Sequence, residues 1–237
     1  MLPVSMPVAA AAPAAEPSPQ EVVEKADEVR FPKESFQVEV QIVSKTGDSE
    51  PEGRRYRILA KGNEAAIVLT VEPESERGQA LLMRGRDLWV FMPDVSQPIR
   101  LSLSQRLVGQ VANGDVARAN FSGDYTAKVL RYDPCGDEVC YVLELEANDS
   151  AVAYHRVVYW VEQKTFHPFK AEFYAISGRL LKTATYSAFK PLGGKIRPTE
   201  VLIEDAVKKG QSLLSYSGLR LRDLPDKVFN KDYLKRL

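Results

Sequence analysis

The clearest chemistry in the chain comes from its two cysteines, Cys135 and Cys140. They flank a turn-like run, residues 136–139, preceded by Pro134. A hairpin brings the residues beside its turn as close as a disulfide requires. We therefore expect a Cys135–Cys140 disulfide, worth roughly 2 kcal/mol because the closed loop is short, and an oxidising compartment. Two interpretations remain open beside it, free thiols and half of a tetrahedral metal shell that His155 and His167 alone would have to complete. We expect no metal and no cofactor.

The same two histidines are the candidates for acid–base catalysis, and their settings do not favour it. His155 lies next to Arg156 in a strand-like run, and His167 precedes Pro168 at a turn. The chain has no nucleophile elbow, phosphate-binding loop or His-Glu-x-x-His zinc motif. We therefore expect a protein that is not an enzyme.

A set of large apolar side chains favours ligand binding instead. Every second residue of a strand lies on the same face, and extensive exposed apolar faces are rare unless they bind something. Each methylene buried there contributes about 0.8 kcal/mol, so an acyl chain could bind without charge chemistry. The alternative is that these side chains simply form the core. The candidate pocket and its lid comprise Leu81, Met83, Trp89, Phe91, Leu103, Leu107, Val108, Val111, Phe121, Val158, Trp160, Phe169 and Phe173.

Alternation of apolar and polar residues predicts the strands that would position these side chains. From Phe36 onward such runs follow one another, separated by short turns rich in Gly, Asp and Ser. About eleven strands, each turning back on the last, indicate a mainly β protein built as an antiparallel meander that curls on itself.

Helices are predicted at both ends of the meander. Ser18 as N-cap, Pro19 at the first helical position and Glu21 three residues after the cap form a helix start, and the helix should end before Pro32. A second helix is predicted over Pro225 to Leu237.

The stretch between Pro93 and Asp124 interrupts the strand pattern. Insertions of such length are usually functional or disordered, and its many apolar residues argue against disorder. We interpret it as a lid whose short helix would present one apolar face, made of Leu103, Leu107, Val108 and Val111.

Composition narrows the function and the domain organisation. Lys plus Arg and Asp plus Glu number 32 each, which argues against nucleic-acid binding. No stretch approaches the ~20 apolar residues of a membrane-spanning helix. Residues 1–17, rich in Ala and Pro, resemble a signal-peptide remnant, with a flexible tail as the alternative. Residues 18–237 are expected to form one domain.

Four segments together resemble a known family. They are LWVFMP at 88–93, PIRL at 98–101, GQVANGD at 109–115 and FSGDY at 121–125. They look like the outer-membrane lipoprotein-sorting family, which is related to the periplasmic lipoprotein carriers LolA and LolB. The resemblance implies a LolA-like half-barrel: an unclosed antiparallel β-barrel with an N-terminal helix, a helical lid and a C-terminal helix. Acyl chains would lie between sheet and lid.

These observations predict a periplasmic carrier or chaperone for the acyl chains of lipid or lipoprotein. An inner-membrane exporter or an outer-membrane receptor is a further candidate partner. The alternative is a cell-envelope sensor or structural module that binds a protein with the same half-barrel.

Overall fold

The computed structural model describes residues 16–234, so the predicted leader lies almost wholly outside the described residues. Its main feature is one antiparallel sheet of 13 strands. The strands are β1 (Phe36–Thr46), β2 (Glu52–Lys61), β3 (Ala65–Glu72), β4 (Ala80–Arg84), β5 (Asp87–Phe91), β6 (Ile99–Leu101), β9 (Tyr125–Cys135), β10 (Glu138–Ala147), β11 (Arg156–Glu162), β12 (Pro168–Tyr174), β13 (Leu180–Leu192), β14 (Lys195–Asp205) and β15 (Gly210–Leu221).

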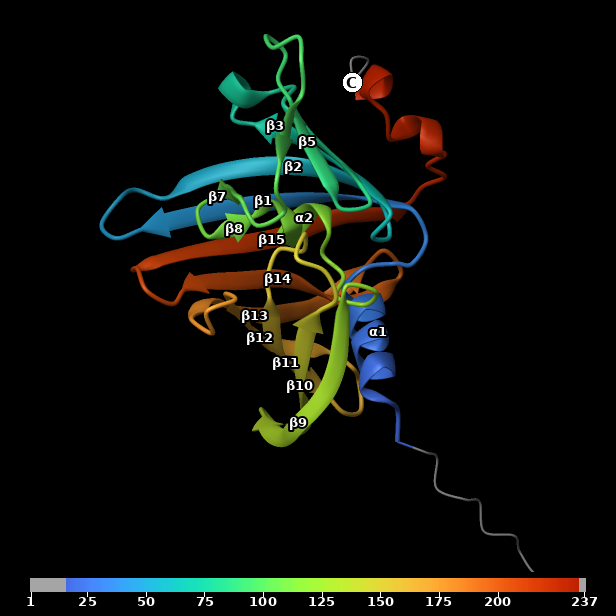
Figure 1. Ribbon diagram of the computed structural model, residues 1–237, viewed down its shortest axis with the longest axis vertical. Helices are drawn as coiled ribbons and strands as arrows, with labels where there is room; N and C mark the ends of the chain where they lie inside the picture. Colours follow the sequence, from blue (N-terminus) through green and yellow to red (C-terminus); the bar gives the residue numbers. More distant parts are fainter. Residues whose placement is uncertain (1–15, 235–237) are drawn as a thin grey trace, which may run out of the picture.

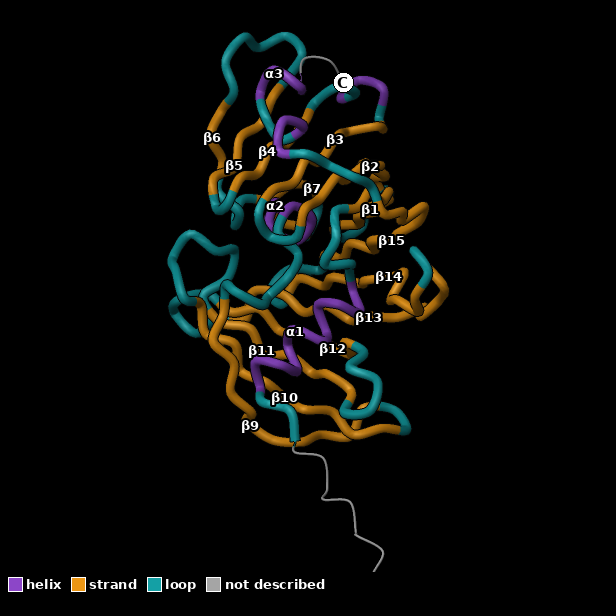
Figure 2. The backbone as a smooth tube through the Cα atoms, turned by 90° about the vertical axis from the view of Figure 1, so that its right-hand side faces the viewer, coloured by secondary structure: helices purple, strands orange, loops and turns teal. Residues whose placement is uncertain are grey.

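The sheet curves but does not close, since β6 forms one edge and β9 the other (Figures 1 and 2). The predicted unclosed antiparallel β-barrel is confirmed, with 13 strands in the sheet where the sequence indicated about eleven. Strands next to each other in the sheet are consecutive in the chain, except that β1 pairs with β15.

The chain passes from one edge of the sheet to the other through residues 102–124, which we call the covering segment. It contains a small hairpin, β7 (Arg106–Val108) with β8 (Val111–Ala112), followed by the short helix α2 (Asn113–Ala117). Figure 1 shows these elements in front of β1 and β15. Because it must link β6 to β9, the segment crosses the face of the sheet that we call the inner face.

The predicted helical face across Leu103, Leu107, Val108 and Val111 is wrong. Val108 pairs with Val111 across a tight turn at Gly109 and Gln110, where Gly109 has a positive φ of 52°. This conformation suits glycine and a hairpin turn rather than a helix. The helix begins only at Asn113, where Asp115 Oδ2 accepts a hydrogen bond from the N–H of Ala112.

Helix α1 (Pro19–Arg30) closes one side of the inner face, as predicted. Ser18 and Glu21 form the expected reciprocal capping box. Val22, Val23 and Ala26 are fully buried, and the helix packs on β9, β12 and β14.

The predicted C-terminal helix is wrong as one continuous element. The 3-10 helix η2 (Asp226–Val228) precedes the short helix α3 (Lys231–Leu234), and residues 235–237 lie outside the described part. Asn230 separates them because its side-chain oxygen accepts a hydrogen bond from the N–H of Tyr233 and starts a new helix there. Between Glu74 and Glu76 lies one further turn of 3-10 helix, η1.

Both faces of the sheet carry buried apolar clusters. The main cluster lies on the inner face, under α1 and the covering segment. On the outer face the C-terminal segment covers β2, β3 and β4 with Leu224, Val228 and Phe229. The predicted disulfide between Cys135 and Cys140 is present in a second outer cluster. No helix within residues 16–234 is long and apolar enough to cross a membrane.

Candidate functional site

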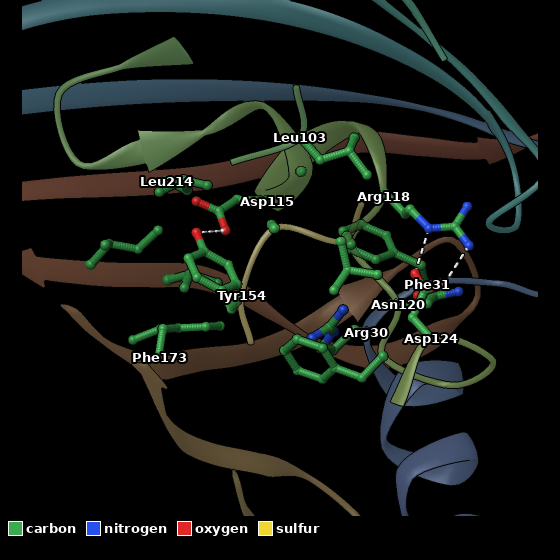
Figure 3. Close-up of a pocket in the computed structure, with 18 of the residues that line it drawn as sticks. Arg30, Phe31, Leu103, Asp115, Arg118, Asn120, Asp124, Tyr154, Phe173 and Leu214 are labelled. Atoms are coloured by element: carbon green, nitrogen blue, oxygen red, sulfur yellow. Dashed lines mark hydrogen bonds and ion pairs between the residues drawn. The ribbon is translucent and has the colours of Figure 1, made fainter. Parts of the chain in front are cut away.

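The candidate site is a cavity of about 70 Å³ between the inner face, α1 and the covering segment (Figure 3). Strands β13, β14 and β15 contribute Ala184, Val201, Ile203 and Leu214 to its wall. Phe173 extends this wall from β12, while Leu103 and Phe121 close it from the covering segment. The cavity is therefore mainly aliphatic and aromatic, and part of its wall is a segment outside the sheet.

One ion pair lies beside the cavity under the covering segment, and its carboxylate, Asp115, lines the cavity. Lys182, on β13, pairs with Asp115 of α2, and its Nζ also donates to the carbonyl of Gln110 at 3.0 Å. The hydroxyl of Tyr154 donates to Asp115 Oδ1 at 2.7 Å (Figure 3). Burial, reinforced by the charge of Asp115, raises the pKa of Tyr154 well above its ordinary value, so the hydroxyl keeps its proton and acts as donor.

A second ion pair faces the cavity from α1. The guanidinium of Arg30 lies over the rings of Phe121 and Tyr186, and its Nη2 is 3.7 Å from Asp27 Oδ1. Asp27 Oδ2 accepts hydrogen bonds from the backbone N–H groups of Phe121 and Ser122. Burial raises the pKa of Asp27 while Arg30 and the two amides oppose the rise.

At the rim, Arg118 joins the covering segment to two hairpin turns of the sheet. Its guanidinium pairs with Asp124 (Figure 3) and donates to the carbonyls of Asn63 and Gly85. Asp124 also accepts from Arg86 at 3.0 Å. The edge of the covering segment is thus held mainly by hydrogen bonds and ion pairs.

Comparison with solved structures identifies the fold. A LolA superfamily protein from Nitrosomonas europaea is 58% identical, with a TM-score of 0.88 over 91% of this chain and 99% of its own. The chain belongs to the LolA superfamily. A protein-family model whose description reads "uncharacterized protein" matches residues 62–236. The predicted family resemblance is therefore confirmed.

A more distant structure shows the same LolA-like fold. A domain from Vibrio parahaemolyticus, described as an outer membrane lipoprotein-sorting protein, is 22% identical with a TM-score of 0.78. The match covers 92% of this chain and 98% of that one. None of the curated proteins compared with the chain matches it.

In this LolA-superfamily chain, three of the predicted pocket residues line the cavity: Leu103, Phe121 and Phe173. Met83, Val108 and Val111 belong to the inner cluster without lining the cavity. Leu81 and Leu107 line a separate hollow beside β3 and β5.

Trp89 and Phe91 lie on the outer face, contrary to the prediction. The turn at Gly85 and Arg86 pairs Met83 with Leu88, so the inner face continues through Leu88 and the alternate residues of β5. Trp89 and Phe91 instead pack against the C-terminal segment.

The predicted positions on β11 and β12 are also on the outer side. Val158 and Trp160 pack around the disulfide, while Tyr159 between them is buried in the inner cluster. Both faces of β11 are apolar, so alternation could not tell them apart. Phe169 is 36% exposed, because a register shift between Trp160 and Val161 leaves it without a partner in the strand pairing.

Sequence reasoning selected neither the polar lining residues Arg30, Asp115 and Tyr154 nor Asp27 and Lys182, which pair with two of them. The sequence pattern did not indicate that these polar side chains would be buried. One signal was present for Lys182, which shares the parity of Ala184 and Tyr186 on β13, both buried inner-face residues. Among the described residues no group of three or more His, Cys, Asp or Glu side chains is placed to hold a metal ion.

Proposed function

We propose that this protein binds the acyl chains of a lipid or lipoprotein in the cavity and carries them through the periplasm. The observation that carries the proposal is an apolar cavity walled partly by the sheet and partly by a separate segment held at its edge by polar contacts. Membership of the LolA superfamily supports it, as does the lipoprotein-sorting description of the Vibrio parahaemolyticus domain. The protein acts by binding, with an exporter or receptor supplying and taking the cargo.

The cavity must widen to admit a full acyl chain. A water-sized group needs about 10–15 Å³ of such cavity space, so about 70 Å³ accommodates only a few such groups, fewer than the carbons of a full acyl chain. We therefore infer that this is a closed form. Displacement of the covering segment would widen the cavity, because Leu103 and Phe121 would withdraw with it.

Ala184 offers a direct test, since it lines the cavity from β13 and is only 2% exposed. Ala184→Leu should fill the cavity from the sheet side and reduce displacement of a fluorescent fatty acid, with thermal unfolding checking the fold. Ala151→Leu, at an exposed turn position, is the matched control and should bind like the wild type. Native mass spectrometry of the purified protein would detect lipid retained from the cell.

The proposal fails if the wild-type protein neither retains nor binds any acyl ligand. It also fails if Ala184→Leu and Ala151→Leu bind equally well, because the ligand would then lie elsewhere. A protein partner that binds both variants equally, without lipid, would favour the sensor or interaction module.

A further inference from the structure

Three cationic side chains lie at or beside the cavity, and they differ in how many of their N–H donors have acceptors. Arg30 and Arg118 line the cavity, and Lys182 pairs with its lining residue Asp115. Arg118 uses Nε, Nη1 and Nη2 on Asp124 and two backbone carbonyls. Lys182 uses its ammonium on Asp115 and the carbonyl of Gln110. These two cations serve to hold the covering segment.

Arg30 is only 6% exposed and is not fully used. Its Nη1 donates to the hydroxyl of Tyr186 at 3.4 Å, but Nε and Nη2 have no hydrogen-bond partner within residues 16–234. A guanidinium has five N–H donors in a fixed fork. A buried donor without a partner costs about 1–3 kcal/mol and more when charged, so such a group calls for a further acceptor.

The nearest carboxylate does not supply that acceptor. Asp27 Oδ2 accepts the backbone N–H groups of Phe121 and Ser122, at 2.9 and 2.7 Å. Its Oδ1 stays 3.7 Å from Arg30 Nη2, outside hydrogen-bond range, and has no partner among the described residues. Asp27 therefore balances the charge of Arg30 while two donor nitrogens remain available.

The side chain that carries these donors lines an apolar space. Arg30, at the end of α1 (Figure 3), lines the same cavity as Phe121, Tyr186 and Ala184. The geometry points to Arg30 as the head-group site of the cavity, binding the carboxylate of a fatty-acid-like ligand whose chain lies along the apolar wall. This inference rests on the proposed function and specifies its ligand class: an acyl chain that ends in an anion.

A carboxylate suits the site better than an uncharged head. It accepts from Nε and Nη2 together, and such charge-assisted paired bonds are about twice as strong as neutral ones. An ester offers the same donors only neutral oxygens, which are weaker hydrogen-bond acceptors. Tyr159, fully buried and with its hydroxyl unpartnered in the described residues, contacts Phe121 under Arg30 and is a further donor on this side.

The test compares two ligands of equal chain length, dodecanoate and methyl dodecanoate, by displacement of a fluorescent acyl probe from the full chain. The wild type should bind the carboxylate about tenfold more tightly or better. The double variant Asp27→Asn with Arg30→Met removes both charges of the pair, a change that buried ion pairs often tolerate. It should lose the preference for the carboxylate, measured as the ratio of its affinities for the two ligands.

The matched control removes the other ion pair of the cavity. Asp115→Asn with Lys182→Met leaves Arg30 intact and should keep the carboxylate preference. Arg30→Lys keeps the positive charge but removes the planar fork of donors, so it should lower the preference for the carboxylate. Because this variant has the native charge balance, it tests the inference even if the double variant does not fold.

Equal affinity of the wild type for the two ligands overturns the inference and leaves the proposed function standing. The inference is also overturned if the preference for the carboxylate survives in both Arg30 variants. It is overturned as well if the preference is lost only in the control variant of Asp115 and Lys182. Binding of neither ligand would instead overturn the proposed function, and this inference with it.

Discussion

Asp27 of helix α1 holds the covering segment 94 residues away, through a 2.9 Å hydrogen bond from the backbone N–H of Phe121 to its Oδ2. The N–H of Ser122 donates to the same oxygen at 2.7 Å. The side chain is 3% exposed, so both bonds are shielded from water. This contact joins the helix at the sheet's open side to the segment that closes the cavity.

Asp27→Asn should loosen the covering segment. The change weakens two charge-assisted hydrogen bonds and should lower the free energy of unfolding by about 1–3 kcal/mol. Hydrogen exchange of the Phe121 and Ser122 amides should accelerate more than exchange in the strands. Glu24→Gln, on the exposed side of the same helix, should change neither. Unaltered exchange at these two amides in Asp27→Asn would contradict the role assigned to this contact.

Gly109→Ala should be strongly destabilising. Gly109 has a φ of +52°, and a Cβ there would lie 2.1 Å from the Oγ of Ser44 and 2.5 Å from that of Ser212. Backbone strain and displacement of the hairpin from β1 and β15 should together cost about 2–4 kcal/mol, measured by urea unfolding.

Gly85→Ala is the control for Gly109→Ala. Gly85 has a similar φ of +58° but open space around its Cβ position, so only the strain of about 1–2 kcal/mol applies. Equal losses in the two variants would show that the β7–β8 hairpin does not pack closely on the sheet.

Removing the disulfide should reduce stability without affecting the cavity. Cys135 and Cys140 are five residues apart in sequence, and cross-linking so short a loop contributes roughly 2 kcal/mol. The double Cys→Ser variant should unfold at lower urea and become insensitive to reductant. Its acyl-probe affinity should equal that of the wild type, since the cysteines lie on the outer face; a large loss of affinity would contradict this separation.

The free energy of unfolding should fall on mild acidification because of His167. Burial lowers the pKa of His167 from its ordinary value of 6.5, despite the opposing charge of Glu162. The unfolded chain therefore takes up the proton first as the pH falls, and native stability, complete above pH 6.5, declines until the folded pKa is passed.

This decline should be smaller in His167→Gln when the free energy of unfolding is compared between about pH 7.5 and about pH 5.5. His155→Gln, which changes the exposed histidine, should retain it. A wild-type decline that depends on His155 rather than His167 would contradict the assignment.

The sequence determined the local elements because their causes are local. Ser18, Pro19 and Glu21 satisfy the first amides of α1 wherever that helix packs, and alternation from Phe36 onward suffices to indicate strands. The turn beside Cys135 brings the cysteines together without help from the rest of the chain. Loosely spaced aromatics, Gly and Asp were enough to indicate the family.

Tertiary structure alone decided which apolar residues face the cavity. Trp89 and Trp160 lie on strands whose two faces are both covered, one by the covering segment and α1, the other by the C-terminal segment or the disulfide cluster. Alternation then has no polar face to mark the outside, and register depends on a turn at Gly85 and a bulge at Phe169. The pairing of Asp27 with Arg30, and of Asp115 with Lys182, depends on contacts between distant segments. These charged groups are shielded from water only in the folded protein, and burial is what makes their pairing necessary.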